Sequence, residues 1–229
     1  MQESKKQITL IFILIVITPI ILLLSRQVLP NNYLASSIYK IIFLSPLLYR
    51  FFIERKTFKQ SLSENFSIKK FKENAYLMLF IGVILALIYI SSFFIFRDYL
   101  DLENISEKLN QLISLNVNNL IFIGLYIIFI NSLLEEFFWR GFIFEKLDKL
   151  INTKKAYFFS AVAFSFHHVM FYYDWFNITF FLLVTLGLII YAAIMNFIFA
   201  KYRDLFSCWL VHIIVDIVQI FIAFKLFVI

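Results

Sequence analysis

Seven apolar runs of about the length needed to cross a lipid bilayer dominate this chain of 229 residues. A membrane-spanning helix needs about 20 mostly apolar residues to cross a hydrocarbon core about 30 Å thick. The chain is 62% hydrophobic, which is more apolar surface than a soluble domain of this size can bury. The sequence therefore predicts an all-α fold, a polytopic transmembrane helix bundle of about seven spans. The runs cover residues 8–25, 34–53, 75–96, 117–146, 156–173, 176–200 and 206–228, and any of the last three could be a shorter re-entrant segment.

The Lys and Arg residues gather between the apolar runs. Loops 54–74, 147–155 and 201–205 are basic, and Lys5 and Lys6 precede the first run. Basic loops stay on the cytoplasmic side of a membrane, so we expect an integral membrane protein with its N-terminus in the cytoplasm. The net charge of +6 then reflects membrane topology, and we expect the lipid bilayer, and no nucleic acid, as a partner.

The chain divides near residue 116 in its content of ionisable residues. Residues 1–115 are predicted to form N-terminal transmembrane helices with a basic cytoplasmic loop, and residues 116–229 a catalytic helix bundle. Between them, residues 104–115 repeat apolar positions at a spacing typical of a short helix lying on the outer membrane interface.

Several ionisable residues fall inside the predicted spans of the second half. A charged group in a spanning helix costs several kcal/mol, so such residues indicate a functional site by default. In the first half, Lys40 lies near a span end, where we expect its ammonium to reach the interface. The many ionisable residues inside the spans of the second half predict a polar active site within the membrane. The residues of the second half are Glu135, Glu136, Arg140, His167, His168, His212 and Asp216.

The spacing of these residues suggests roles. Glu136 and Arg140 are four residues apart, as in a helical ion pair, which is structural or functional with about equal weight. Glu135 has no local partner, and a carboxylate buried without one holds a proton more tightly than in water, which suits a general base.

Spacing also suggests different roles for the three histidines. His212 and Asp216 are four residues apart, so the carboxylate can hold one ring nitrogen. His167 points away from His168, which favours a packing role for His167. If residues 117–148 and 155–173 form a hairpin turning near residue 151, Glu135 and His168 lie at the same depth.

Two imidazoles and a carboxylate can hold Zn²⁺, or they can position a water molecule directly while a glutamate takes its proton. Either arrangement predicts hydrolysis of a peptide bond. The sequence has no H-E-x-x-H pair and no G-x-S-x-G segment, so neither a soluble zinc protease nor a serine hydrolase is indicated.

Three motifs occur in a fixed order. Glu135 to Arg140 reads E-E-x-x-x-R, Phe164 to His168 reads F-x-x-x-H, and His212 to Asp216 reads H-x-x-x-D. This set resembles the CAAX-protease and bacteriocin-processing family of intramembrane endopeptidases, which includes the type II CAAX prenyl endopeptidases and the bacterial Abi proteins. The resemblance covers about residues 116–225.

The resemblance implies roles for six residues. Glu135 is expected to be the general base, with Glu136 and Arg140 supporting it. His168 and His212 are expected to bind the water or a metal, and Asp216 to orient or complete that site. The expected cofactor is Zn²⁺ or another divalent metal, and a metal-free glutamate mechanism is the alternative.

The resemblance implies an intramembrane endopeptidase that cleaves a membrane-associated peptide or protein, in bacteriocin maturation or self-immunity. A non-proteolytic membrane immunity or scaffold protein of the same family is the alternative. An ion-coupled transporter is disfavoured, because neither repeated halves nor Gly/Pro-broken helices are visible. Frequent Phe, Ile, Lys and Asn indicate an AT-rich genome, so the expected location is a bacterial plasma membrane.

Overall fold

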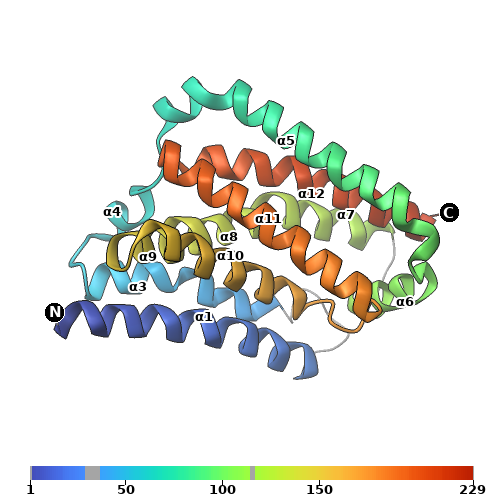
Figure 1. The fold of residues 1–229 in the computed structure, drawn as a ribbon, viewed down its shortest axis with the longest axis horizontal. Coiled ribbons are helices and arrows are strands. Elements are labelled where there is room, and N and C mark those ends of the chain that lie inside the picture. Colours follow the sequence, from blue (N-terminus) through green and yellow to red (C-terminus); the bar gives the residue numbers. More distant parts are fainter. Residues whose placement is uncertain (1, 29–36, 114–116, 229) are drawn as a thin grey trace.

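The computed structural model describes residues 2–28, 37–113 and 117–228, and every regular element in those ranges is helical. The long helices lie side by side as one bundle, with the start of α1 and the end of α12 at opposite ends (Figure 1). The elements are α1 (Gln2–Val28), η1 (Ser37–Leu44), α3 (Ser45–Phe52), α4 (Phe58–Ser63), α5 (Ile68–Phe96), η2 (Arg97–Tyr99), α6 (Leu102–Ile113), α7 (Val117–Leu125), η3 (Tyr126–Asn131), α8 (Ser132–Phe138), η4 (Trp139–Phe144), α9 (Glu145–Leu150), α10 (Thr153–Val169), α11 (Ile178–Tyr202) and α12 (Leu205–Val228).

Five helical stretches in the described ranges are long and apolar enough to cross a membrane. They are Ser4–Ser25, Phe58–Tyr99, Leu120–Leu150, Ile178–Tyr202 and Leu205–Lys225. Only 11% of the apolar window is buried in the second and fourth of these stretches, so most of their apolar side chains face outward. An apolar surface of this extent on helices of this length is typical of helices that face lipid. The predicted polytopic transmembrane bundle is confirmed.

The other two of the seven expected runs form shorter helices. Residues 34–53 include two eight-residue helices, η1 and α3, which meet just before Pro46, and residues 34–36 lie outside the described ranges. Proline has no backbone N–H and is favoured at the first turn of a helix, so a new helix starts there. The run 156–173 forms α10, which is 17 residues long and ends at Val169.

The stretch from α7 to α9 is one continuous helix interrupted by two π-helical turns. These turns are η3 and η4, and α8 lies between them. A π turn hydrogen-bonds i to i+5 and occurs often at functional sites. The side chains of Phe138, Trp139 and Phe142 are fully buried, so this stretch lies at the centre of the bundle.

The basic loops meet at one end of the molecule. Arg50, at the end of α3, donates to the carbonyl oxygens of Ser61 and Gly141 at 2.6 and 2.5 Å and pairs with Glu145 at 3.4 Å. Arg203 pairs with Asp148 at 2.6 Å. The three loops predicted to share one side of the membrane therefore do lie together. Their position in the cytoplasm stays a prediction.

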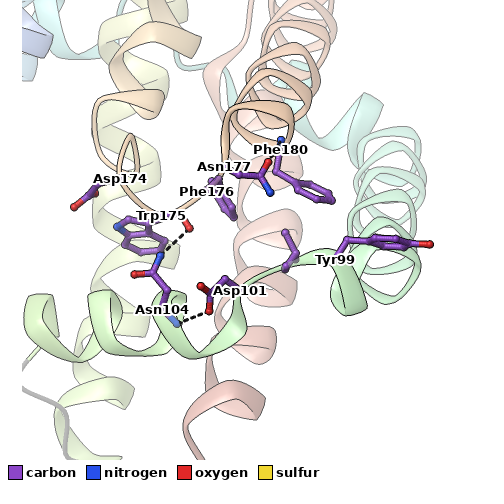
Figure 2. A pocket seen from close by; sticks show the side chains of 9 residues that line it. Tyr99, Asp101, Asn104, Asp174, Trp175, Phe176, Asn177 and Phe180 are labelled. Carbon is purple, nitrogen blue, oxygen red and sulfur yellow. Dashed lines mark hydrogen bonds between the residues drawn. The ribbon is translucent and has the colours of Figure 1, made fainter.

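Helix α6 lies at the opposite end of the bundle (Figure 1), which confirms the short helix expected there, with residues 114 and 115 outside the described ranges. Its Asn104 donates to the carbonyl oxygen of Trp175 at 3.2 Å, and its Lys108 pairs with Asp174 at 2.9 Å. Figure 2 shows side chains that line a pocket between the segment from η2 to α6 and the segment that leads into α11. The volume of this pocket is about 320 Å³. None of the six predicted site residues lines this cavity.

The predicted division at 115/116 lies in residues that the structure does not describe. The described residues on its two sides share one hydrophobic core. Phe43 of η1 packs on Phe138 with a ring separation of 5.0 Å, and Tyr39 packs on His167 at 5.8 Å. The N-terminal helices therefore pack around the helices formed by the second half of the chain.

Candidate active site

The six predicted site residues come together inside the bundle. Five of them are buried, and the His168 side chain is 23% exposed. Glu135 and Glu136 lie on α8, Arg140 on η4, His168 on α10, and His212 and Asp216 on α12. The turn between α9 and α10 falls at residues 151 and 152, as predicted, and it brings α10 back alongside α8.

Glu135 lies between the two histidines. Its Oε2 atom is 3.4 Å from Nε2 of His168 and 3.9 Å from Nε2 of His212. Its other oxygen, Oε1, accepts a hydrogen bond of 2.8 Å from the side-chain amide of Asn131. The prediction that Glu135 has no local partner was therefore wrong, because Asn131 lies one helical turn before it. A polar residue four positions from Glu135 in an apolar helix was the signal that could have identified it.

The ring of His212 is held by Glu136. Its Nδ1 donates to Oε1 of Glu136 at 2.7 Å, whereas its Nε2 is 3.6 Å from Oδ1 of Asp216. The sequence predicted that Asp216 could hold a ring nitrogen of His212, and 3.6 Å is too long for a hydrogen bond. The shorter contact comes from another helix, which spacing along α12 could not predict.

The ion pair predicted between Glu136 and Arg140 is present. Arg140 donates to Oε1 of Glu136 at 2.9 Å, and both side chains are fully buried. The guanidinium also lies 4.1 Å from the ring centre of Phe164, within cation–π distance. One carboxylate oxygen of Glu136 thus accepts from both Arg140 and His212.

His168 is oriented by its own helix. Its Nδ1 lies 2.9 Å from the carbonyl oxygen of Phe164, and the two rings are 4.2 Å apart. His167, in contrast, is buried among aromatic rings, with Phe43 at 5.4 Å and Trp139 at 5.7 Å. Those contacts fit the packing role predicted for His167.

The hydrogen bonds at Nδ1 determine what Nε2 offers in a neutral ring. In both His168 and His212, Nδ1 faces an acceptor and therefore carries the proton. Each Nε2 is then an acceptor, and both face Oε2 of Glu135, which has no hydrogen-bond partner among the described residues. When both rings are neutral, three acceptors therefore converge here, and they suit a molecule with hydrogens to donate, of which water is the simplest.

The sequence suggested that the Lys40 ammonium reaches the membrane interface, but Lys40 is buried inside the bundle. It is 6% exposed, and its ammonium lies over the rings of Tyr39 and Tyr126 at 5.8 and 5.5 Å. It interacts electrostatically with Glu135. The prediction was wrong because η1 packs against α8 inside the bundle, whereas the sequence treated residues 34–53 as one continuous span.

The metal predicted at His168 and His212 has compatible donor chemistry, since imidazole nitrogens and a carboxylate are Zn²⁺ ligands. Within the part of the chain that the structure describes, however, no three His, Cys, Asp or Glu side chains are arranged to hold a metal ion. A three-ligand metal site would need side chains to move from these positions. The use of Zn²⁺ or another metal stays a prediction.

Comparison with known proteins identifies one family. Residues 117–218 match the family described as type II CAAX prenyl endopeptidase Rce1-like. No curated protein and no solved structure matches the chain. The matched range includes all six site residues, while Lys40 lies outside it. The part of the chain that carries the site is therefore similar to the type II CAAX prenyl endopeptidase Rce1-like family.

Proposed function

We propose that this protein is an intramembrane endopeptidase that hydrolyses a peptide bond with a water molecule activated by Glu135. One observation carries the proposal: Oε2 of Glu135 and Nε2 of both His168 and His212 converge inside the bundle, with separations of 3.4 and 3.9 Å. The matched family of prenyl endopeptidases supports the same reaction class.

The reaction begins with a water molecule bound by Oε2 of Glu135 and by Nε2 of a histidine. Glu135 takes one proton, and the water oxygen forms a bond to the carbonyl carbon of the scissile peptide. The electron pair of the C=O bond moves to its oxygen, which becomes an oxyanion. When that pair returns, the C–N bond breaks, and the proton held by Glu135 passes to the leaving nitrogen. The products are a carboxylic acid, which then ionises, and an amine.

Glu136 and Arg140 act on this centre through His212. The carboxylate of Glu136 fixes the proton of His212 on Nδ1, so that Nε2 faces the reaction as an acceptor. Arg140 neutralises the buried charge of Glu136 at 2.9 Å. Asp216, with Oδ1 3.6 Å from the same Nε2, can receive a proton or orient a second water. A bound divalent metal would supply Lewis-acid polarisation of water, and the steps assigned here to protein groups need none.

The substrate class follows from the setting. Because the site lies inside a bundle of membrane-spanning helices, we propose a membrane-associated peptide or protein as the substrate, with a lipid-modified tail as one class that the description of the family supports. Bacteriocin maturation and self-immunity in a bacterial plasma membrane, with a cytoplasmic N-terminus, are the settings that we propose.

The test compares membranes that contain the wild type with membranes that contain Glu135→Gln at equal protein level. Labelling of new peptide N-termini, followed by mass spectrometry, should reveal termini that form only with the wild type. Metal analysis and chelation of the same purified protein test whether a metal is required. If the two membranes yield the same termini while a cellular phenotype persists in the variant, the protein acts by binding, as in a non-proteolytic immunity protein.

A further inference from the structure

A second hydrogen bond joins α8 to α12 within about one helical turn of the contact between Glu136 and His212. The indole Nε1 of Trp209 on α12 donates to Oγ of Ser132 on α8 at 3.0 Å. Ser132 lies four residues before Glu136, and Trp209 lies three residues before His212. Residues at these spacings share one face of a helix, so the same two helix faces meet in both contacts.

The hydroxyl of Ser132 is fixed by its own helix and is free to accept from Trp209. Ser132 follows the π turn η3, and its backbone N–H donates to the carbonyl oxygen of Ile127, five residues back. In a regular α-helix that N–H would donate to Ile128. Here the hydroxyl of Ser132 donates to the carbonyl oxygen of Ile128 instead, at 2.5 Å. The oxygen lone pairs are therefore left to accept the indole N–H.

Trp209 has a strong reason to keep this partner. An indole N–H can only donate, and leaving it without an acceptor in apolar surroundings costs free energy. Ser132 is fully buried, so its hydroxyl meets no bulk water that could compete for the indole. Serine hydroxyls commonly hydrogen-bond between helices inside membranes. The bond therefore constrains how α12 lies against α8.

Two contacts along one face hold α12 more tightly than one contact does. With the contact between His212 and Glu136 alone, α12 could pivot about that bond. Three or four residues correspond to about 4.5–6 Å along a helix, so the bond of Trp209 prevents this rotation. A hydrogen bond is lost when its atoms separate by about 1 Å more than in the bond. A small rotation of α12 would therefore break the 2.7 Å contact between Nδ1 of His212 and Oε1 of Glu136.

From these contacts we propose that Ser132 and Trp209 are positioning residues for the endopeptidase reaction proposed above, on which this inference rests. Their hydrogen bond sets the rotation of α12 against α8 and keeps the ring of His212 on the carboxylate of Glu136. They act through His212, whose Nε2 faces Oε2 of Glu135 at 3.9 Å. A change at Ser132 or Trp209 reaches the proposed base by moving that ring.

The test uses Trp209→Phe, which removes the N–H and keeps an aromatic ring, Ser132→Ala, which removes the hydroxyl, and the double variant. Thr18→Val is the control for the serine, because Thr18 is fully buried in α1 and its hydroxyl donates to a carbonyl oxygen four residues back at 2.6 Å. Trp175→Phe is the control for the tryptophan, because the buried Nε1 of Trp175 has no hydrogen-bond partner in the described ranges. The substrate is an internally quenched peptide that carries the sequence around the strongest wild-type-dependent cleavage, in proteoliposomes.

Each single variant should lower kcat about tenfold and leave KM within about twofold, because the substrate contacts are unchanged. The double variant should also lose about tenfold, and not about 100-fold, because both substitutions break the same bond. The two controls should stay within about threefold of the wild type, because they leave both contacts between α8 and α12 intact. If one single variant does not accumulate, the other carries the test.

Magnetic resonance of histidine labelled at its ring nitrogens gives a readout that does not depend on cleavage. The chain has three histidines, and the signal of His212 is the one that disappears in His212→Gln. Its Nδ1 resonance should move in Trp209→Phe and in Ser132→Ala and should stay in place in both controls. The resonance of His168, whose Nδ1 contacts a carbonyl oxygen of its own helix, should not move. A loss of stability alone would leave the His212 resonance of the folded protein unchanged.

A kcat within about threefold of the wild type in the single variants overturns the inference, as does a loss confined to KM. Losses that multiply in the double variant, or a His212 resonance that does not move, also overturn it. Each of these results leaves the proposed function intact as long as the wild type cleaves and Glu135→Gln does not. If the wild type and Glu135→Gln cleave alike, the endopeptidase proposal fails, and the role of Ser132 and Trp209 in it fails as well.

Discussion

The buried pair of Glu136 and Arg140 allows stability to be separated from catalysis. Both side chains have no exposed surface, and they meet at 2.9 Å. Removing one partner of a fully buried ion pair costs about 3–5 kcal/mol, because the other charge stays buried without compensation. Glu136→Met leaves Arg140 in that state and also removes the acceptor of Nδ1 in His212. Arg140→Met leaves Glu136 with His212 as a partner, so the loss of stability in this variant should lie near the lower limit of that range.

The double variant Glu136→Met with Arg140→Met has no unpaired charge left. Replacing a whole buried pair by apolar residues of similar volume is often neutral or stabilising. We therefore expect the double variant to be more stable than Glu136→Met by about 2 kcal/mol, although it carries one more substitution. Its cleavage activity should stay as low as that of Glu136→Met, because Nδ1 of His212 still lacks its acceptor.

The assay is unfolding of the purified protein in mixed micelles with increasing dodecyl sulfate, followed by tryptophan fluorescence, with cleavage measured on the same samples. Arg97→Met is the control, since Arg97 pairs with Asp98 in an exposed contact at 3.4 Å, and it should change stability by less than about 1 kcal/mol. Additive losses of stability in the double variant would refute the coupling. Recovery of cleavage in the double variant would refute the orienting role of Glu136.

Two further substitutions test contacts described above. Asn131→Leu removes the donor to Oε1 of Glu135. This variant should be less stable by about 1–3 kcal/mol, and its kcat should be about 10–100-fold lower. An unchanged kcat would show that this hydrogen bond does not position Glu135. Arg50→Met removes one buried partner of Glu145 and the Arg50 donor to two carbonyl oxygens. We therefore expect a loss of stability of about 3 kcal/mol in the same unfolding assay. A loss below about 1 kcal/mol would contradict that account.

The parts of the site that depend on spacing along one helix were predictable from the sequence. Glu136 and Arg140 meet because residues four apart share a helix face. Glu135 and His168 meet because the hairpin turn falls near residue 151 and equal residue counts give equal depth. The apolar runs predicted the bundle for the same reason, since length and hydropathy alone decide whether a helix can cross a bilayer.

Contacts between helices distant in sequence were not predictable. Nothing near His212 in the chain indicates that Glu136 holds its Nδ1 atom, because that contact depends on how α12 packs against α8. Lys40 was misplaced because residues 34–53 resemble a simple span, whereas Pro46 starts a new helix and η1 packs inside the bundle. The π-helical turns on each side of α8 have no pattern of apolar residues that distinguishes them from an α-helix.

Glu135 is the residue on which the proposed mechanism depends, because its Oε2 atom, the proposed base, lies between the Nε2 atoms of the two histidines. The most direct measurement is the rate at which Glu135→Gln, purified and reconstituted in lipid vesicles, cleaves a peptide that the wild type cleaves. Gln has nearly the same shape and can keep the hydrogen bond from Asn131, but it cannot accept a proton from water. The account predicts a rate at least about 1,000-fold below the wild type with peptide binding and melting temperature unchanged. Cleavage by this variant within tenfold of the wild type would contradict it.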